Sequence, residues 1–178
     1  MRVESIAKVH PAVAAASLVV FFTLLMVLSA FVRIPLFFTP VPLTMQTLVV
    51  YLSMVVLREK ASFSQILYLM LGAAGLPVFT NAGAGLLYLA GPTGGYLIGF
   101  IAAAVVLGRC LPEKLTFSKS ILLFSLAALV VYLCGMSWLI GVHKFSLLQA
   151  FLAGLVPFIP GEAIKITFAS LFAVRYRV

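Results

Sequence analysis

The sequence has very few charged residues. Asp, Glu, Lys and Arg make up only 9% of its 178 residues, whereas 64% are hydrophobic and the mean hydropathy is +1.24. A soluble domain of this length could not remove so much apolar surface from water, so the solvent around most of the chain must be lipid. The composition therefore excludes an ordinary soluble domain.

Groups for catalysis and metal binding are also scarce. The chain has four acidic residues and two histidines, and it lacks any H-E-x-x-H, G-x-S-x-G or Walker-type sequence. Its two cysteines, Cys110 and Cys134, do not have the spacing of metal ligands, and we predict that both are reduced packing residues. We therefore expect no enzyme, no metal site and no cofactor, and active transport by this chain would need energy from a partner.

The hydrophobic residues form runs of the length that a membrane-spanning helix needs, about 20 residues. They do not alternate with polar residues as they would in a lipid-facing β-barrel. We predict an all-α integral membrane protein with a single membrane-embedded domain over residues 1–178 and six transmembrane helices. The expected ranges are about 12–32, 43–57, 63–74, 93–107, 120–141 and 146–174, the last broken near residues 157–161.

Lysine and arginine are distributed unequally between the two sides of this predicted bundle. Nine basic residues, here called the main cluster, lie on one side, and only Arg33 and Lys144 lie on the other. Lys165 lies inside the last helix. By the positive-inside rule both termini are expected in the cytoplasm, which agrees with an even number of helices. The main cluster consists of Arg2, Lys8, Arg58, Lys60, Arg109, Lys114, Lys119, Arg175 and Arg177. Membrane topology thus accounts for the net charge of +8, and we expect no nucleic-acid partner.

Two charges lie deep inside the last apolar segment. A charged side chain at membrane depth costs at least about 2.5–3.5 kcal/mol on insertion scales, so Glu162 and Lys165 are expected to have a function. Their spacing of three residues places them on one helical face, where they can pair or hold a ligand between them. The alternative is an ion pair that only fastens this helix to itself or to a neighbour.

Other polar and small residues are predicted on the same side of the membrane. The outer connection over residues 76–92 has no charged residue, so we expect it to be buried or folded over a site. It contains Asn81, while Gln46 and Tyr96 lie near the outer ends of their helices. Gly94 and Gly95 would let a ligand approach a helix N-terminus, whose free N–H groups favour an anionic group.

Four motifs resemble those of a known family. Residues 40–48 (PVPLTMQTL), 72–79 (GAAGLPVF), 91–100 (GPTGGYLIGF) and 157–165 (PFIPGEAIK) are similar, in order and spacing, to signatures of the BioY family. Its members are the biotin-specific S components of energy-coupling-factor (ECF) transporters. The family usually has aspartate where this chain has Glu162, which is one methylene longer.

The resemblance implies a six-helix S-component fold in the bacterial cytoplasmic (inner) membrane. It implies capture of biotin from outside, and delivery with an energising module of a transmembrane coupling protein and two ATPases. Glu162 would accept a hydrogen bond from the ureido N–H, and Lys165 would bind the carboxylate or the ureido carbonyl. Asn81, Gln46 and Tyr96 are further expected contacts. Partner docking would use Ala12 and Ala16, a small-residue ridge on the first helix that permits close helix approach.

Three alternatives stay open at this point. The chain could carry a different vitamin, or a biotin precursor without the ureido ring. It could also be a structural membrane subunit that binds no ligand. An enzyme acting on lipid is the third alternative, and it has no motif in its favour.

Overall fold

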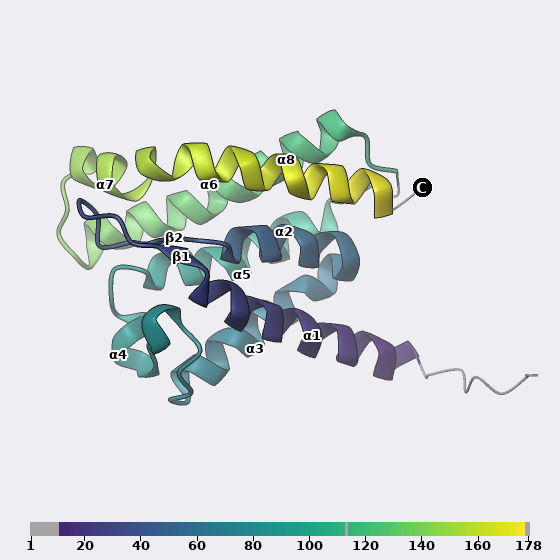
Figure 1. The fold of residues 1–178 in the computed structure, drawn as a ribbon, viewed down its shortest axis with the longest axis horizontal. Helices are drawn as coiled ribbons and strands as arrows, with labels where there is room; N and C mark the ends of the chain where they lie inside the picture. The colour runs from purple at the N-terminus through teal and green to yellow at the C-terminus, as the bar shows by residue number, and fades with distance from the viewer. Residues whose placement is uncertain (1–10, 113, 177–178) are drawn as a thin grey trace, which may run out of the picture.

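A computed structural model describes residues 11–112 and 114–176 of the chain, which are almost entirely helical (Figure 1). The helices are α1 (Pro11–Phe31), α2 (Gln46–Leu57), α3 (Ala61–Ala73), α4 (Gly85–Leu89), α5 (Gly94–Arg109), α6 (Phe117–Gly141), α7 (Leu147–Gly154) and α8 (Ile159–Tyr176). Single 3-10 turns lie at η1 (Arg58–Lys60), η2 (Thr80–Ala82) and η3 (Val156–Phe158). Two short antiparallel strands, β1 (Arg33–Ile34) and β2 (Leu43–Thr44), form a hairpin between α1 and α2.

The long helices run side by side along one axis and form a bundle (Figure 1). Three helical stretches in the described part of the chain are long and apolar enough to cross a membrane: Pro11–Phe31, Phe117–Gly141 and Leu147–Tyr176. At about 1.5 Å per residue, the 21 residues of α1 extend roughly 30 Å, the thickness of a bilayer's hydrocarbon core. Together with the shorter α2, α3 and α5, they make the chain a multi-pass α-helical membrane protein with a six-helix bundle.

Several helix boundaries differ from those expected. The second helix begins at Gln46 and not near residue 43, because Leu43 and Thr44 form strand β2, which pairs with β1. The helix expected from residue 120 begins at Phe117, since the Thr116 side chain accepts a hydrogen bond from the Lys119 N–H and caps it. The connection over residues 76–92 is not a plain loop, because it contains η2 and α4.

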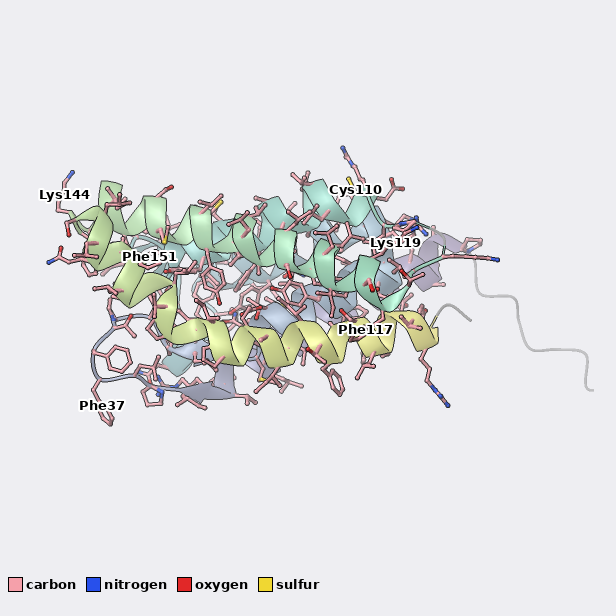
Figure 2. The ribbon with its side chains drawn as sticks, turned by 90° about the horizontal axis from the view of Figure 1, so that it is seen from above. Phe37, Cys110, Phe117, Lys119, Lys144 and Phe151 are labelled. Atoms are coloured by element: carbon pink, nitrogen blue, oxygen red, sulfur yellow. The ribbon has the colours of Figure 1, made fainter. Side chains whose placement is uncertain are left out.

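The two ends of the bundle differ in charge. Phe37 and Lys144 lie at one end, here called the outer end, and Cys110 and Lys119 lie at the other (Figure 2). The start of α1 and the end of α8 are also at this second end (Figure 1). The described members of the predicted cytoplasmic cluster follow this division, while Arg2, Lys8 and Arg177 lie outside the described residues. The second end is therefore the cytoplasmic one.

Helices α5 and α6 approach each other closely enough for their backbones to touch. A Cβ atom on Gly99 would lie 2.9 Å from the Cα of Val131, and one on Gly95 would lie 2.7 Å from the carbonyl oxygen of Cys134. Cys134 is half-buried at this contact, whereas Cys110 is exposed, and both are free thiols. The prediction of a packing role is therefore wrong for Cys110.

We predict that Gly99→Ala destabilises the protein, because its new methyl group would meet backbone atoms that cannot move aside. Overpacking of this kind costs about 1–3 kcal/mol, and the melting temperature of the detergent-purified protein should fall accordingly. Gly141→Ala is the matched control, since no atom lies within 4 Å of the added Cβ at that position. Equal melting temperatures for the two variants would contradict the close contact between α5 and α6.

Candidate functional site

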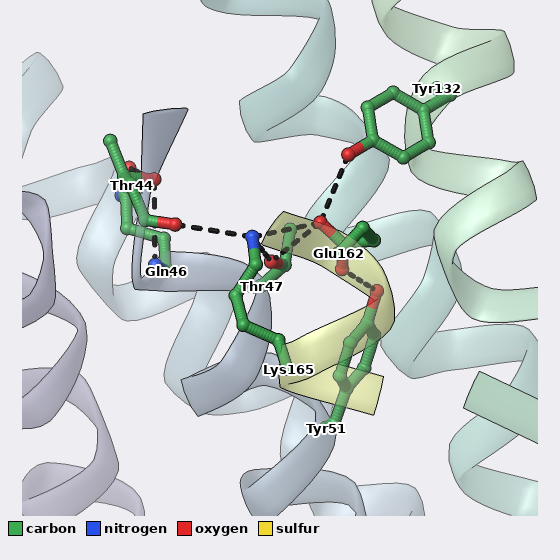
Figure 3. Close-up of polar contacts among 7 residues, drawn as sticks. All are labelled: Thr44, Gln46, Thr47, Tyr51, Tyr132, Glu162 and Lys165. Carbon is green, nitrogen blue, oxygen red and sulfur yellow. Dashed lines mark hydrogen bonds and ion pairs between the residues drawn. The ribbon is translucent and has the colours of Figure 1, made fainter. Parts of the chain in front are cut away.

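The two intramembrane charges form an ion pair at the start of α8. The Nζ atom of Lys165 lies 2.8 Å from Oε2 of Glu162, and the two residues are 6% and 4% exposed (Figure 3). The chain reaches them through the helix break at η3, which places Glu162 in the first turn of α8. A carboxylate is favoured there by the free N–H groups of the helix N-terminus. The predicted pairing is thus confirmed.

Three hydroxyl groups from two other helices surround the Glu162 carboxylate. The Tyr51 hydroxyl donates to Oε1 at 2.6 Å, while those of Thr47 and Tyr132 donate to Oε2 at 3.1 and 2.9 Å (Figure 3). Thr47 and Tyr51 share a face of α2, and Tyr132 comes from α6. A buried carboxylate is stable only when such donors satisfy its lone pairs. With Lys165 as the fourth donor, three donors reach Oε2 and one reaches Oε1.

The Lys165 ammonium group is equally well satisfied. Besides the ion pair, its Nζ donates to Thr47 Oγ1 at 2.6 Å and to the Thr44 carbonyl oxygen at 3.2 Å (Figure 3). An ammonium group has three N–H donors, so each has a partner. The pair is consequently neutral as a unit, and its two charges are held in fixed positions.

A cavity opens beside the ion pair. Sites for small molecules commonly combine apolar walls with a few polar groups. Both charged side chains reach its wall. The remaining lining comes from Val41, Pro42, Thr44, Gln46, Thr47, Thr80, Tyr88, Thr93, Tyr96, Phe100, Val131, Tyr132 and Phe158.

The outer side of the cavity is covered by the hairpin between α1 and α2. Val41 and Pro42 line the cavity, and the Thr39 hydroxyl donates to the Ala153 carbonyl of α7 at 2.7 Å. Leu43 packs against Gly161 at the start of α8. Phe37 at the hairpin tip is fully exposed (Figure 2). The cover is thus fastened to α7 through Thr39 and to α8 through Leu43, while Phe37 is exposed.

This arrangement agrees with comparisons to known proteins. The model of the BioY family matches residues 3–178. The chain belongs to the BioY family. Among relatives, "Biotin transporter BioY" of Thermotoga maritima is 38% identical over 157 residues, which cover 88% of this chain and 91% of that protein. "Probable biotin transporter BioY" of Pyrococcus horikoshii is 40% identical over 139 residues, or 76% and 80% of the two chains.

A solved structure has the same fold as this BioY family member. The crystal structure of the S-component for biotin from an ECF-type ABC transporter superposes with a TM-score of 0.85 at 26% sequence identity. The match covers 93% of this chain and 92% of that chain. The six-helix S-component fold expected from the sequence motifs is therefore confirmed.

Two further residues that the sequence singled out also line the cavity. Gln46 is the first residue of α2, and its Nε2 donates to the Tyr68 hydroxyl at 2.9 Å. The Tyr96 hydroxyl donates to the Gly154 carbonyl oxygen at 2.7 Å. Both side chains are therefore held in place by protein partners.

Three of the expected ligand contacts lie elsewhere. Asn81 is exposed outside the cavity lining, where its Oδ1 accepts a hydrogen bond from Arg33. A Cβ on Gly94 would meet the Leu89 carbonyl oxygen at 1.8 Å, and Gly95 faces α6. The two glycines are thus required for helix packing, and the expectation that they open a path to a ligand has no support in their surroundings.

The residues that sequence reasoning missed are the hydroxyl groups around Glu162. Thr47 and Tyr51 could have been found from their four-residue spacing at the start of a helix, beside a motif that already drew notice. Tyr132 lies in the apolar middle of its helix, where nothing in its local sequence distinguishes it.

We predict that Tyr51→Phe lowers the stability of the ligand-free protein by about 1.5–3 kcal/mol, because it removes a hydrogen bond to a buried charge. Tyr96→Phe is the comparison, since it removes a bond to a neutral carbonyl and should cost only about 0.5–1.5 kcal/mol. Unfolding in detergent measures both. A smaller loss for Tyr51→Phe than for Tyr96→Phe would show that Glu162 does not depend on this hydroxyl.

Proposed function

We propose that this protein is the biotin-binding subunit of an uptake system. It captures biotin at the outer end of the membrane and delivers it with an ATP-driven energising module. The observation that carries the proposal is the cavity with a fixed carboxylate and a fixed ammonium group side by side on its wall, in a chain of the BioY family.

The paired charges suit the ureido ring of biotin. A cyclic urea presents N–H donors next to a carbonyl acceptor. Glu162 supplies the acceptor for an N–H, and Lys165, whose Nζ lies 2.8 Å from that carboxylate, bonds to the carbonyl by exchanging one of its present acceptors. Charge-assisted hydrogen bonds in a site shielded from water are strong, so this pair can account for tight and selective binding.

A ligand that bonds to Oε2 exchanges bonds with the protein, since three donors already reach that oxygen. Thr47 and Tyr132 line the cavity, whereas Tyr51 is not among the described lining residues. We therefore assign Thr47 and Tyr132 as the hydroxyls that ureido N–H groups replace. Tyr51 keeps Glu162 in position throughout.

Aromatic side chains form the apolar part of the proposed site. The rings of Tyr132 and Phe158 stack with a centroid distance of 6.2 Å, and Tyr96 meets Tyr132 edge to face at 6.3 Å. These rings support one another and so present rigid walls to the ligand's fused ring system. Gln46 lies at the same cavity and completes its polar part.

Energy for uptake would come from a coupling protein and two ATPases, because the chain has no nucleotide-binding motif. Ala12 and Ala16 are exposed near the cytoplasmic end of α1. Small residues at this spacing let another helix approach closely, which supports their proposed role in docking.

Substitution of either charge should abolish high-affinity biotin binding. Glu162→Gln and Lys165→Met each remove a charge-assisted hydrogen bond to the ligand, which is worth about 1.5–3 kcal/mol. We expect a loss of about 10- to 100-fold in affinity, measured by equilibrium binding to purified protein. Lys144→Met is the control, because this cation is exposed at the outer end. Near-wild-type affinity in both site variants would refute the site.

Ligand-dependent thermal stability separates the alternatives. A ligand at a thousandfold excess over its dissociation constant stabilises the protein by about 4 kcal/mol. Biotin should therefore raise the melting temperature strongly, whereas a precursor without the ureido ring should compete poorly. Stronger competition by the precursor would assign the protein to a different ligand, and no shift with either compound would indicate a structural subunit.

Ala16→Trp should weaken association with the energising module and leave biotin binding unchanged, since the large ring blocks helix contact far from the cavity. Co-purification of the complete complex and biotin binding to the isolated subunit provide the two readouts. Leu24→Trp, at an exposed position farther along α1, is the control. If both variants assemble equally well, the ridge is not the docking surface.

A further inference from the structure

The outer end of the bundle carries an arginine without an acidic partner. Arg33 begins β1 at the base of the hairpin, and its side chain is exposed. Its Nη2 donates to Asn81 Oδ1 at 2.7 Å. Within residues 11–112 and 114–176, the acidic side chains are Glu59 at the cytoplasmic turn and the buried Glu162, so Arg33 forms no ion pair there. Four of its five N–H donors are not engaged by this hydrogen bond.

The inner cavity offers no comparable cation. Lys165 uses all three of its N–H donors, and its charge is balanced by Glu162 at 2.8 Å. A ligand carboxylate placed there would add an uncompensated negative charge to a largely apolar, buried site, which is costly. The carboxylate of a bound acid is therefore better accommodated outside the cavity.

An open vestibule adjoins the inner cavity on the side of Arg33. Arg33 and Asn81 both line it. Four residues line the vestibule and the inner cavity alike, so the two spaces adjoin: Pro42, Thr80, Tyr88 and Thr93. A ligand with its ring beside the ion pair can therefore extend a flexible acidic arm outward past these residues.

We propose that Arg33 and the vestibule form an outer subsite for the ligand's carboxylate, an inference that rests on the proposed function. The carboxylate replaces Asn81 as the partner of the guanidinium group. An arginine binds a carboxylate through two parallel charge-assisted bonds, which are stronger than its bond to a neutral amide. The exchange is thus favourable. Lys165 then binds the ureido carbonyl, which leaves the carboxylate to Arg33.

The hydrogen bond from Arg33 to Asn81 also links the hairpin to the turn η2. Asn81 has a left-handed backbone conformation, with φ of 63°, inside the turn η2. The neighbouring Thr80 lines both spaces and is hydrogen-bonded to Tyr88. Arg33 therefore connects the hairpin to the wall that the two spaces share. Replacement of Asn81 by a carboxylate loosens this connection as the ligand enters.

The test compares biotin with biotinamide, whose neutral amide replaces the carboxylate. Wild-type protein should bind biotin about tenfold more tightly than biotinamide. In Arg33→Gln the preference should disappear through weaker biotin binding, while biotinamide affinity stays within about twofold. Arg33→Lys should give an intermediate preference, because it keeps the charge and loses the paired donors.

Lys144→Gln is the matched control. Lys144 is the other described outer cation, and its Nζ donates to the Gly141 carbonyl oxygen away from the vestibule. This variant should retain the full preference for biotin. An unchanged ratio of the two affinities in Arg33→Gln would overturn the outer subsite while leaving the biotin site intact. Binding of neither compound to wild-type protein would instead refute the proposed function and the subsite with it.

A measurement on the wild-type protein tests the outer subsite without any variant, so that misfolding of a variant cannot affect the result. Salt screens exposed charges, with a Debye length of about 10 Å at 0.1 M and about 3 Å at 1 M. Raising the salt concentration should therefore slow the association of biotin severalfold and leave that of biotinamide unchanged. Equal salt dependence for the two compounds would rule out a role for Arg33 in capturing the carboxylate.

Discussion

The carboxylate of Glu162 is the group on which the rest of this structure depends. A buried charge requires donors from several directions, and here they come from α2, α6 and α8. Satisfying one side chain thus fixes the relative positions of three helices that are distant in the sequence. The break before α8 contributes by placing Glu162 in the first helical turn, directly below the hairpin that covers the cavity.

The charged residues differ between the cytoplasmic end, the interior and the outer end of this protein. The described basic residues cluster at the cytoplasmic end, one neutral pair occupies the interior, and two cations lie at the outer end. The interior pair can recognise polar groups without attracting a further ion, whereas Arg33 can attract an anion without being buried. An amphipathic acid has a corresponding distribution, with polar uncharged groups at one end and a carboxylate at the other.

Much of this could be predicted from the sequence, because lipid imposes strong composition rules. Apolar run lengths indicated the helices, basic residues indicated the orientation, and two charges in an apolar segment indicated the site. Tyr132 escaped prediction because a single hydroxyl in an apolar helix has no local signature. Gly94 and Gly95 pack against neighbouring helices, and the sequence could not show this because ligand approach and helix packing require the same missing Cβ. The strand pair at Leu43 and Thr44 depends on a partner segment, which no local pattern specifies.

The convergence of three helices on one carboxylate has a kinetic consequence. The hydroxyls of Thr47 and Tyr132 belong to different helices, so moving α2 away from α6 would remove donors from a charge that has no access to water. Such a network is lost as a unit, since each broken bond leaves the carboxylate less stable than before. Separation of α2 from α6 in the ligand-free protein is accordingly slow, because the whole network has to break at once.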